Sequence, residues 1–137
     1  MNGENIRKPR VLGGGAIELR TDSENWPQWL RDCRTENMEA EVINGRVIVW
    51  GGTLHDGIVV DCDWLGGTVR EAIWMKGNFM AGRWMNGDWR SGYFGVAIWN
   101  DGVFRDGEFH GLWIRGLWLG GKFDGWYEKT GESPEIK

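Results

Sequence analysis

The chain has 137 residues, among them 23 glycines and 11 tryptophans, and a formal net charge of −4 at pH 7. This length fits one domain, and the acidic balance is unlike the basic surface of a nucleic-acid-binding protein. Two cysteines, Cys33 and Cys62, allow at most one disulfide and have no metal-ligand spacing. We therefore expect no metal and no cofactor, and Cys62 is expected to be a buried free thiol.

Residues 1–15 are predicted to form an N-terminal arm, polar and basic at first and then rich in glycine. Arg7, Lys8 and Arg10 are candidate contacts to the acidic surface of a partner, and the alternative is a frayed terminus. The arm lacks the apolar core of a signal peptide, and no segment has the apolar length of a membrane helix. We expect a protein of the bacterial or host cytoplasm that binds no membrane, with incorporation into a virion as a further expectation.

Residues 16–50 are predicted to cap the N-terminal end of the fold. The first five alternate apolar and polar side chains, as a short strand does. A helix is expected over residues 25–35, because Asn25 and Gln28 have the spacing of a capping box and Pro27 suits a first turn. Its apolar face would comprise Trp26, Trp29, Leu30 and Cys33, and we expect this face to cover the exposed core at one end of the fold.

Residues 41–50 are β-branched and apolar, and Asn44-Gly45 interrupts them. This dipeptide is a strong signal for a tight turn between antiparallel strands. The stretch is therefore predicted to be a hairpin or the first strands of the repeat that follows.

Residues 51–127 follow a five-residue pattern of small-x-large-x-x, whereas residues 128–137 form a charged tail. Each large residue is preceded two places earlier by Gly, Ala or Cys, and one residue is dropped between Phe109 and Trp113. A short period kept over this length indicates a solenoid. The predicted core of large rings is Trp64, Trp74, Phe79, Trp84, Trp89, Phe94, Trp99, Phe104, Phe109, Trp113, Trp118 and Phe123.

The five-residue period fits neither a helix nor a long strand, but it fits a short extended segment followed by a corner. Residues two apart in an extended segment point to the same side, so the small and the large residue would both face inward. Four such sides would close a square coil of about 20 residues. Units four apart would then stack, and each buried indole N–H would need a backbone carbonyl.

This pattern resembles the pentapeptide-repeat family, whose units also place a small residue two places before an apolar central one. The matching pairs here include Gly77/Phe79, Gly82/Trp84 and Gly87/Trp89, with Gly for Ala and aromatic rings for Leu. The resemblance implies an all-β fold, a right-handed quadrilateral β-helix. A weaker similarity, to MORN repeats, is carried by the G-x-W-x-x-G-x-F texture, but those repeats have a period above twenty residues.

No catalytic constellation is visible in the sequence. His55 and His110 are far apart and are best explained as surface residues, and the aspartates suit turns. The aromatic ladder could instead face outward and stack on sugars or nucleic acid, but such platforms also have a basic groove. Met75, Met80 and Met85 form a second five-spaced set, which would either pack at the corners or offer an adaptable contact surface to a protein.

We therefore expect a non-enzymatic structural module, a rigid solenoid that docks to larger protein partners, for example as a phage or virion-associated assembly component. The expected partners are proteins, either copies of this chain or other members of an assembly, and not nucleic acid. One alternative is an inhibitor of a gyrase-like enzyme or a host defence protein by surface mimicry, although residues 51–127 carry seven basic and nine acidic side chains, a net charge of only −2. The second alternative is a carbohydrate-binding module.

Overall fold

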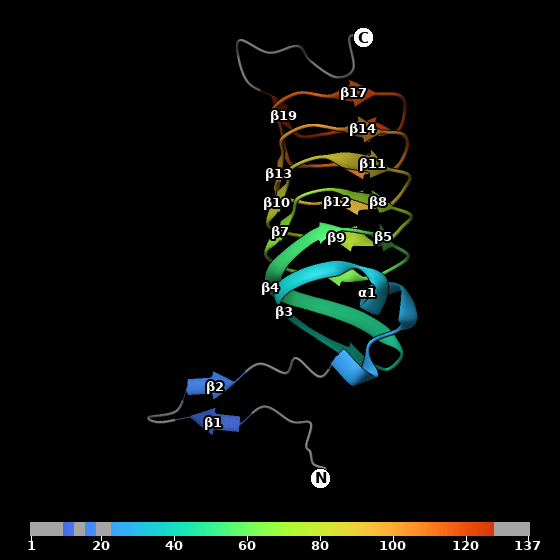
Figure 1. The fold of residues 1–137 in the computed structure, drawn as a ribbon. Helices are drawn as coiled ribbons and strands as arrows, with labels where there is room; N and C mark the ends of the chain where they lie inside the picture. The colour runs from blue at the N-terminus through green and yellow to red at the C-terminus, as the bar shows by residue number, and fades with distance from the viewer. Residues whose placement is uncertain (1–9, 13–15, 19–22, 128–137) are drawn as a thin grey trace.

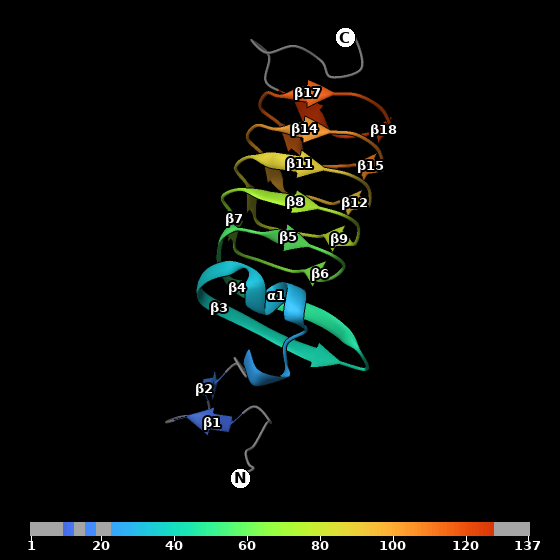
Figure 2. The same cartoon turned by 45° about the vertical axis from the view of Figure 1, so that its right-hand side comes forward.

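The computed structural model describes residues 10–12, 16–18 and 23–127. Most of this chain forms a parallel β-solenoid of about five turns, with one short α-helix near its N-terminal end (Figure 1). In Figure 2 the strands nearest the viewer run from left to right, and the chain rises as it returns behind them. The coil is therefore right-handed, and the fold is all-β as expected.

Three faces, not four, enclose the coil. Leu54 pairs with Val69 and Val59 pairs with Trp74, so most turns take 15 residues, and units three apart lie above one another. The square cross-section that the resemblance implied is therefore wrong, and so is the predicted stacking of units four apart. A five-residue unit fixes only one side and one corner, so the number of sides depends on how successive turns pack.

Each face is a stack of short parallel strands. Face 1 contains the second half of β4 (Arg46–Asp56), then β7 (Thr68–Val69), β10 (Arg83–Trp84), β13 (Ile98–Trp99), β16 (Leu112–Trp113) and β19 (Trp126–Tyr127). Face 2 contains β5 (Ile58–Val59), β8 (Ala72–Trp74), β11 (Gly87–Trp89), β14 (Val103–Phe104) and β17 (Leu117–Trp118). Face 3 contains the first half of β4, then β6 (Asp63–Trp64), β9 (Asn78–Phe79), β12 (Tyr93–Phe94), β15 (Glu108–Phe109) and β18 (Lys122–Phe123).

The small residues lie at the corners, where the backbone of one turn presses on the turn before it. Gly77 has a φ of +119°, and a Cβ there would lie 2.5 Å from the carbonyl oxygen of Cys62. Both facts favour glycine, because a side chain is strained at this φ and has no space. The small position was predicted to face inward, and where it holds a side chain (Cys62, Ala72 and Ala97) that side chain is indeed buried in the core. Where it holds glycine, as at Gly77, it also forms the tight corner.

The core is a column of stacked rings. The large residues of the repeat from Trp64 to Trp113 are almost completely buried, and those of the last turn are partly exposed. Along each face, rings of successive turns stack in parallel with centroids 4.4 to 5.8 Å apart. Around one turn they meet edge to face, as Trp74, Phe79 and Trp84 do pairwise. Both geometries are favourable for aromatic pairs, so three rings per turn fill the triangular interior.

The indole N–H groups are satisfied less often than predicted. Trp99 donates to the carbonyl of Arg115 at 3.1 Å. Among the described residues, four buried indoles have no hydrogen-bond acceptor, namely Trp64, Trp74, Trp84 and Trp89. The carbonyls of the small and large positions already accept bonds from the next turn, as Gly77 accepts from Tyr93 and Phe79 accepts from Gly95. Ring stacking therefore takes precedence over indole hydrogen bonding inside this core.

A hairpin of β3 (Arg34–Ile43) and β4 closes the N-terminal end of faces 1 and 3. Asn44 and Gly45 form its turn with φ values of 52° and 79°, which confirms the predicted turn signal. The hairpin also supplies the first strand of the solenoid, because β4 pairs with β6 and then with β7. The register of β3 shifts between Glu36 and Glu39, which lets the strand follow β4 around a corner.

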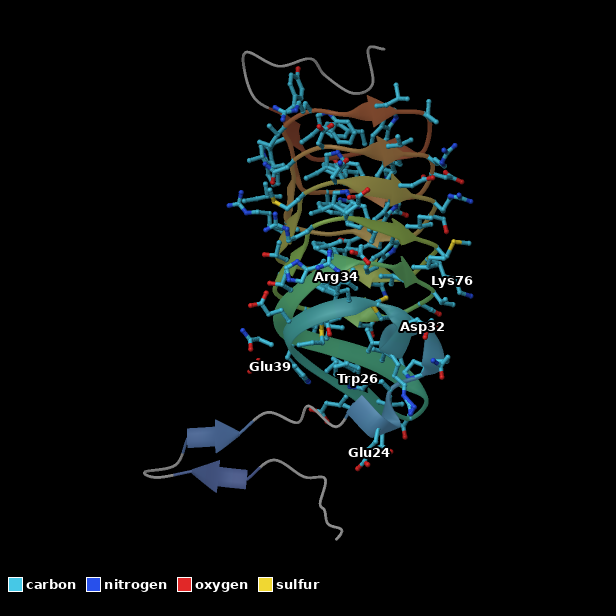
Figure 3. The ribbon with its side chains drawn as sticks, viewed as in Figure 1. Glu24, Trp26, Asp32, Arg34, Glu39 and Lys76 are labelled. Carbon is cyan, nitrogen blue, oxygen red and sulfur yellow. The ribbon has the colours of Figure 1, made fainter. Side chains whose placement is uncertain are left out.

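The short helix α1 (Gln28–Asp32) closes the same end of face 2, where it lies against β5. Leu30 is fully buried, and Trp26 donates its indole N–H to the carbonyl of Ala40 at 3.1 Å, beneath the hairpin (Figure 3). The predicted helix over residues 25–35 is too long. Asn25 ends a 3₁₀ turn, η1 (Ser23–Asn25), and Pro27 is the N-cap without a side-chain hydrogen bond, so the predicted capping box is absent.

Two further strands lie before the helix. β1 (Arg10–Leu12) pairs antiparallel with β2 (Ala16–Glu18) in a separate two-stranded sheet. The strand predicted over residues 16–20 is therefore present over Ala16–Glu18, and residues 19 and 20 lie outside the described residues. The partner of β2 is β1, which belongs to the predicted arm of residues 1–15. In the sequence a glycine-rich stretch separates the two strands, and such a stretch is typical of a hairpin connection.

Candidate interaction surface

Face 2 carries an aliphatic column on its outer side. The middle residue of each unit points outward, and along this face those residues are Ile58, Ile73, Asp88, Val103 and Leu117. Ile58 and Leu117 are exposed, as are Val60, Met75 and Leu119 at the adjoining corner. The same positions of face 3 hold Asp63, Asn78, Tyr93, Glu108 and Lys122. The outer surface is therefore apolar on one face and polar on another.

An open groove of about 570 Å³ follows this column over four successive turns. Its floor includes Ile58, Ile73 and Val103, and glycines keep the backbone accessible along it. The carboxylates Asp56 and Glu71 and the amide of Asn86 border it at the corner between faces 1 and 2. A shallow groove with an aliphatic floor and a polar border fits a protein segment better than a small polar substrate.

Asp88 lies in the middle of the aliphatic column, but its charge is compensated. Its carboxylate accepts hydrogen bonds from Arg105 at 2.6 Å and from Arg90 at 3.2 Å. Partial burial acts to raise the pKa of Asp88, and the hydrogen bonds and charges of the two arginines outweigh this and lower it. The carboxylate is thus held charged and oriented within an otherwise apolar surface.

The three methionines predicted as partner contacts do not form one site. Met75 follows β8 on face 2, Met80 follows β9 on face 3, and Met85 follows β10 on face 1. Residues five apart lie at successive corners of the same turn, so only Met75 belongs to face 2. Arg7 and Lys8 lie outside the described residues, and Arg10 lies in β1.

The aliphatic column of face 2 was not among the contact residues predicted from the sequence. Ile58 and Ile73 are 15 residues apart and Val103 follows after two more intervals of 15, and this spacing is visible in the sequence. This spacing indicates a common face only if the coil has three sides, because in a square coil of about 20 residues per turn these residues would lie on different faces.

The two histidines make separate surface contacts. Nε2 of His55 lies 2.8 Å from Oε1 of Glu36. His110 lies 3.1 Å from Glu108 and 3.6 Å from Asp124, and its ring packs on Tyr93. Within the described part of the chain, no three His, Cys, Asp or Glu side chains gather as metal ligands would.

Both cysteines are buried free thiols in this structure, as was expected of Cys62. Burial raises the pKa of Cys33 to about 11, and burial likewise raises the pKa of the Cys62 thiol. Because the thiolate is the reactive form, both side chains are held in an inert state at neutral pH.

None of the described helices has the length and apolar character needed to cross a membrane. The chain matches no protein-family model, no curated protein and no solved structure.

Proposed function

We propose that the protein is a non-enzymatic interaction module, a rigid β-solenoid that docks to a protein partner through face 2. The observation that carries this proposal is the aliphatic column and groove on that face. Contiguous exposed apolar surface on a soluble domain is typical of a protein-binding site. The solid ring core supports the same function, because it holds the groove in one shape and so limits the entropy lost on binding.

Asp88 and its two arginines would give the docking site its specificity. A partner segment that lies along Ile58, Ile73 and Val103 must satisfy or avoid this ion cluster at the centre of the groove. Polar groups within an apolar interface fix the register of the bound partner more than they add affinity.

A role in a larger assembly, such as a phage particle, belongs to the same proposal and draws on the rigidity of the coil. We also propose that the coil is a three-sided, Gly- and Trp-rich variant of the pentapeptide-repeat architecture, which is supported by the small residue two places before each large one.

The alternative functions have weaker support. Mimicry of nucleic acid needs a dense acidic surface, and residues 51–127 carry a net charge of only −2 (seven basic and nine acidic side chains). Carbohydrate recognition by the aromatic ladder requires exposed rings, and the ladder from Trp64 to Trp113 is buried.

Site-specific photo-crosslinking tests the docking face. A benzoylphenylalanine at position 73 of face 2 is compared with one at position 78 of face 3, in extracts of the organism that encodes the protein. We expect a discrete crosslinked protein from position 73 alone, and its loss when Ile58→Lys is added. No product from position 73, or the same products from both positions, would refute docking through face 2.

A further inference from the structure

Among the described residues, no further turn lies over the C-terminal turn of the coil. Its strands β17, β18 and β19 are each the last of their face. One turn earlier, Phe104, Phe109 and Trp113 are almost completely buried. Phe104 stacks on Trp118 and Phe109 stacks on Phe123, and Trp113 is the strand partner of Tyr127. In the last turn itself, Trp118 and Phe123 are only partly buried and Tyr127 is 44% exposed. The end of the solenoid is therefore a cross-section through an aromatic core.

Apolar side chains also surround this cross-section. Leu117 and Leu119 are exposed beside β17, and Trp126 on β19 is 61% exposed. At the opposite end, β3 and α1 close the N-terminal ends of all three faces, and their own side chains Met38 and Leu30 are buried. The two ends thus differ in kind, one capped and one open.

The residues that follow Tyr127 are unsuited to cover the open end. Residues 128–137 read EKTGESPEIK, in which five of ten side chains are charged and Ile136 is the one large aliphatic residue. They contain no small-x-aromatic unit, and Pro134 interferes with a strand that must pair. The sequence of this segment therefore offers no further unit of the repeat and no aromatic ring to extend the columns.

We propose that the C-terminal turn binds the C-terminal turn of a second copy of this chain, tail to tail about a two-fold axis. The ring columns of this fold are built by aromatic stacking between turns, and the open turn of a second copy offers partly exposed aromatic rings for the same kind of contact. Lys122 and Asp124 are exposed on the same rim, so a two-fold arrangement can place each cation near the partner's anion.

The capped end restricts the assembly to two copies. Head-to-tail stacking would require an open N-terminal end, and β3 and α1 occupy that position. Tail-to-tail contact uses the same patch on both copies and closes on itself, whereas head-to-tail contact would make fibres. The proposal is independent of docking through face 2, but a dimer would present that face twice and so increase avidity for a repetitive partner.

The mass of the full-length protein in solution tests the proposal first. By light scattering and native mass spectrometry at about 1 to 100 µM, we expect a particle of twice the 15.7 kDa chain mass. A monomer over this whole range would overturn the proposal.

Two end variants and a matched control locate the contact. Trp126→Lys and Leu119→Lys change exposed residues of the last turn, and each should shift the particle to the monomer mass with unchanged circular dichroism. Ile58→Lys changes a residue of comparable exposure, 51%, at the opposite end of face 2, and it should leave the dimer intact. The proposal would be contradicted if Ile58→Lys broke the dimer while Trp126→Lys and Leu119→Lys left it intact.

Removal of residues 128–137 distinguishes a second copy from the chain's own tail. If the tail covers the open end, the full chain is a monomer and the truncated chain dimerises, which would refute the proposal. A spin label at position 124 should give a short distance between protomers in the dimer. A label at position 36, near the capped end, should give a much longer distance between protomers. A distance at position 36 shorter than the one at position 124 would exclude the tail-to-tail arrangement.

Discussion

At the scale of single residues, the corner glycines decide whether one turn can rest on another. Gly77 combines a φ of +119° with a Cβ position 2.5 Å from the Cys62 carbonyl oxygen. Gly45, in the hairpin turn, has a positive φ of +79° but open space around its Cβ position. Gly77 therefore combines backbone strain with steric contact between turns, whereas Gly45 has the backbone strain alone, and a comparison of the two distinguishes these effects.

We expect Gly77→Ala to lower the free energy of unfolding by at least about 2 kcal/mol, because strain of about 1 to 3 kcal/mol adds to the contact with the preceding turn. Gly45→Ala should have the smaller effect, because it carries the strain alone. Urea denaturation of the two variants measures the difference. Equal destabilisation would show that contact between turns contributes nothing at this corner.

Arg46 joins the hairpin to the first turn of face 3. Its guanidinium donates to Asp63 at 2.8 Å and to the Cys62 carbonyl at 3.2 Å, and lies 3.1 Å from Asp61. Asn78 donates to Asp63 as well. The hydrogen bond from Arg46 is the main cause that lowers the pKa of Asp63. The Asp63 carboxylate is thus stabilised in the folded state relative to the unfolded chain.

A group with a lowered folded pKa stabilises the fold above its unfolded pKa, near 3.9 for Asp, and loses this contribution as the pH falls through the folded value. We therefore expect Asp63→Asn to destabilise the protein at pH 7 and to differ less from the wild type as the pH falls below about 4. Urea denaturation at pH 7 and pH 3 checks this. A difference that stays constant, or grows toward low pH, would contradict the assignment.

At the scale of elements, α1 has five residues and holds its place by packing. Leu30 is buried, and Sγ of Cys33 lies 3.6 Å from the carbonyl oxygen of Ile58 at the edge of β5. An isolated helix of this length is not stable in water, so the helix and the edge it covers depend on each other.

Leu30→Ala should destabilise the protein by about 2 to 5 kcal/mol and increase the reaction of Cys33 with a thiol reagent, because the cap loosens over β5. Gln28→Ala, an exposed change in the same helix that removes only the contact with Asp32, should cost well under about 1 kcal/mol. The two variants are compared by urea denaturation and by thiol labelling. A small effect of Leu30→Ala with unchanged labelling would show that α1 is dispensable.

The helix also shows where local sequence signals fail. Asn25, Pro27 and Gln28 suit a helix start near residue 25, but η1 occupies residues 23–25 and α1 begins at Gln28. Trp26 was expected on the helical face, and its indole instead bonds to Ala40, on the distant strand β3. By contrast, Asn44-Gly45 predicted its turn correctly, because the positive φ values needed there are a local property.

At the scale of the whole molecule, the capped and open ends predict unequal stability along the axis. In repeat folds each turn is stabilised by its neighbours, so a terminal turn with one neighbour opens first. Leu117, Lys122 and Trp126 donate their amide N–H groups to the turn before them, and no further turn follows within the part of the chain that the structure describes.

In the monomeric Trp126→Lys variant, we expect these amides to exchange with deuterium faster than the amides of Asn78 and Tyr93 in the middle of the coil. In the wild-type dimer the last turn should be protected, because the partner covers it. Hydrogen exchange followed by mass spectrometry measures both. Equal exchange along the coil in the monomeric variant would contradict this gradient.

The sequence by itself determined the solenoid, the residues of its interior and the N-terminal cap. The five-residue alternation of small and large residues is a local pattern, and burial of the rings from Trp64 to Trp113 follows from it. Only the tertiary structure decided the number of sides. That number depends on corner angles and on ring stacking between residues 14 or 15 apart, as for Trp99 and Trp113 or Phe79 and Phe94. It therefore also decided that Ile58, Ile73 and Val103 share one face and that Met75, Met80 and Met85 do not.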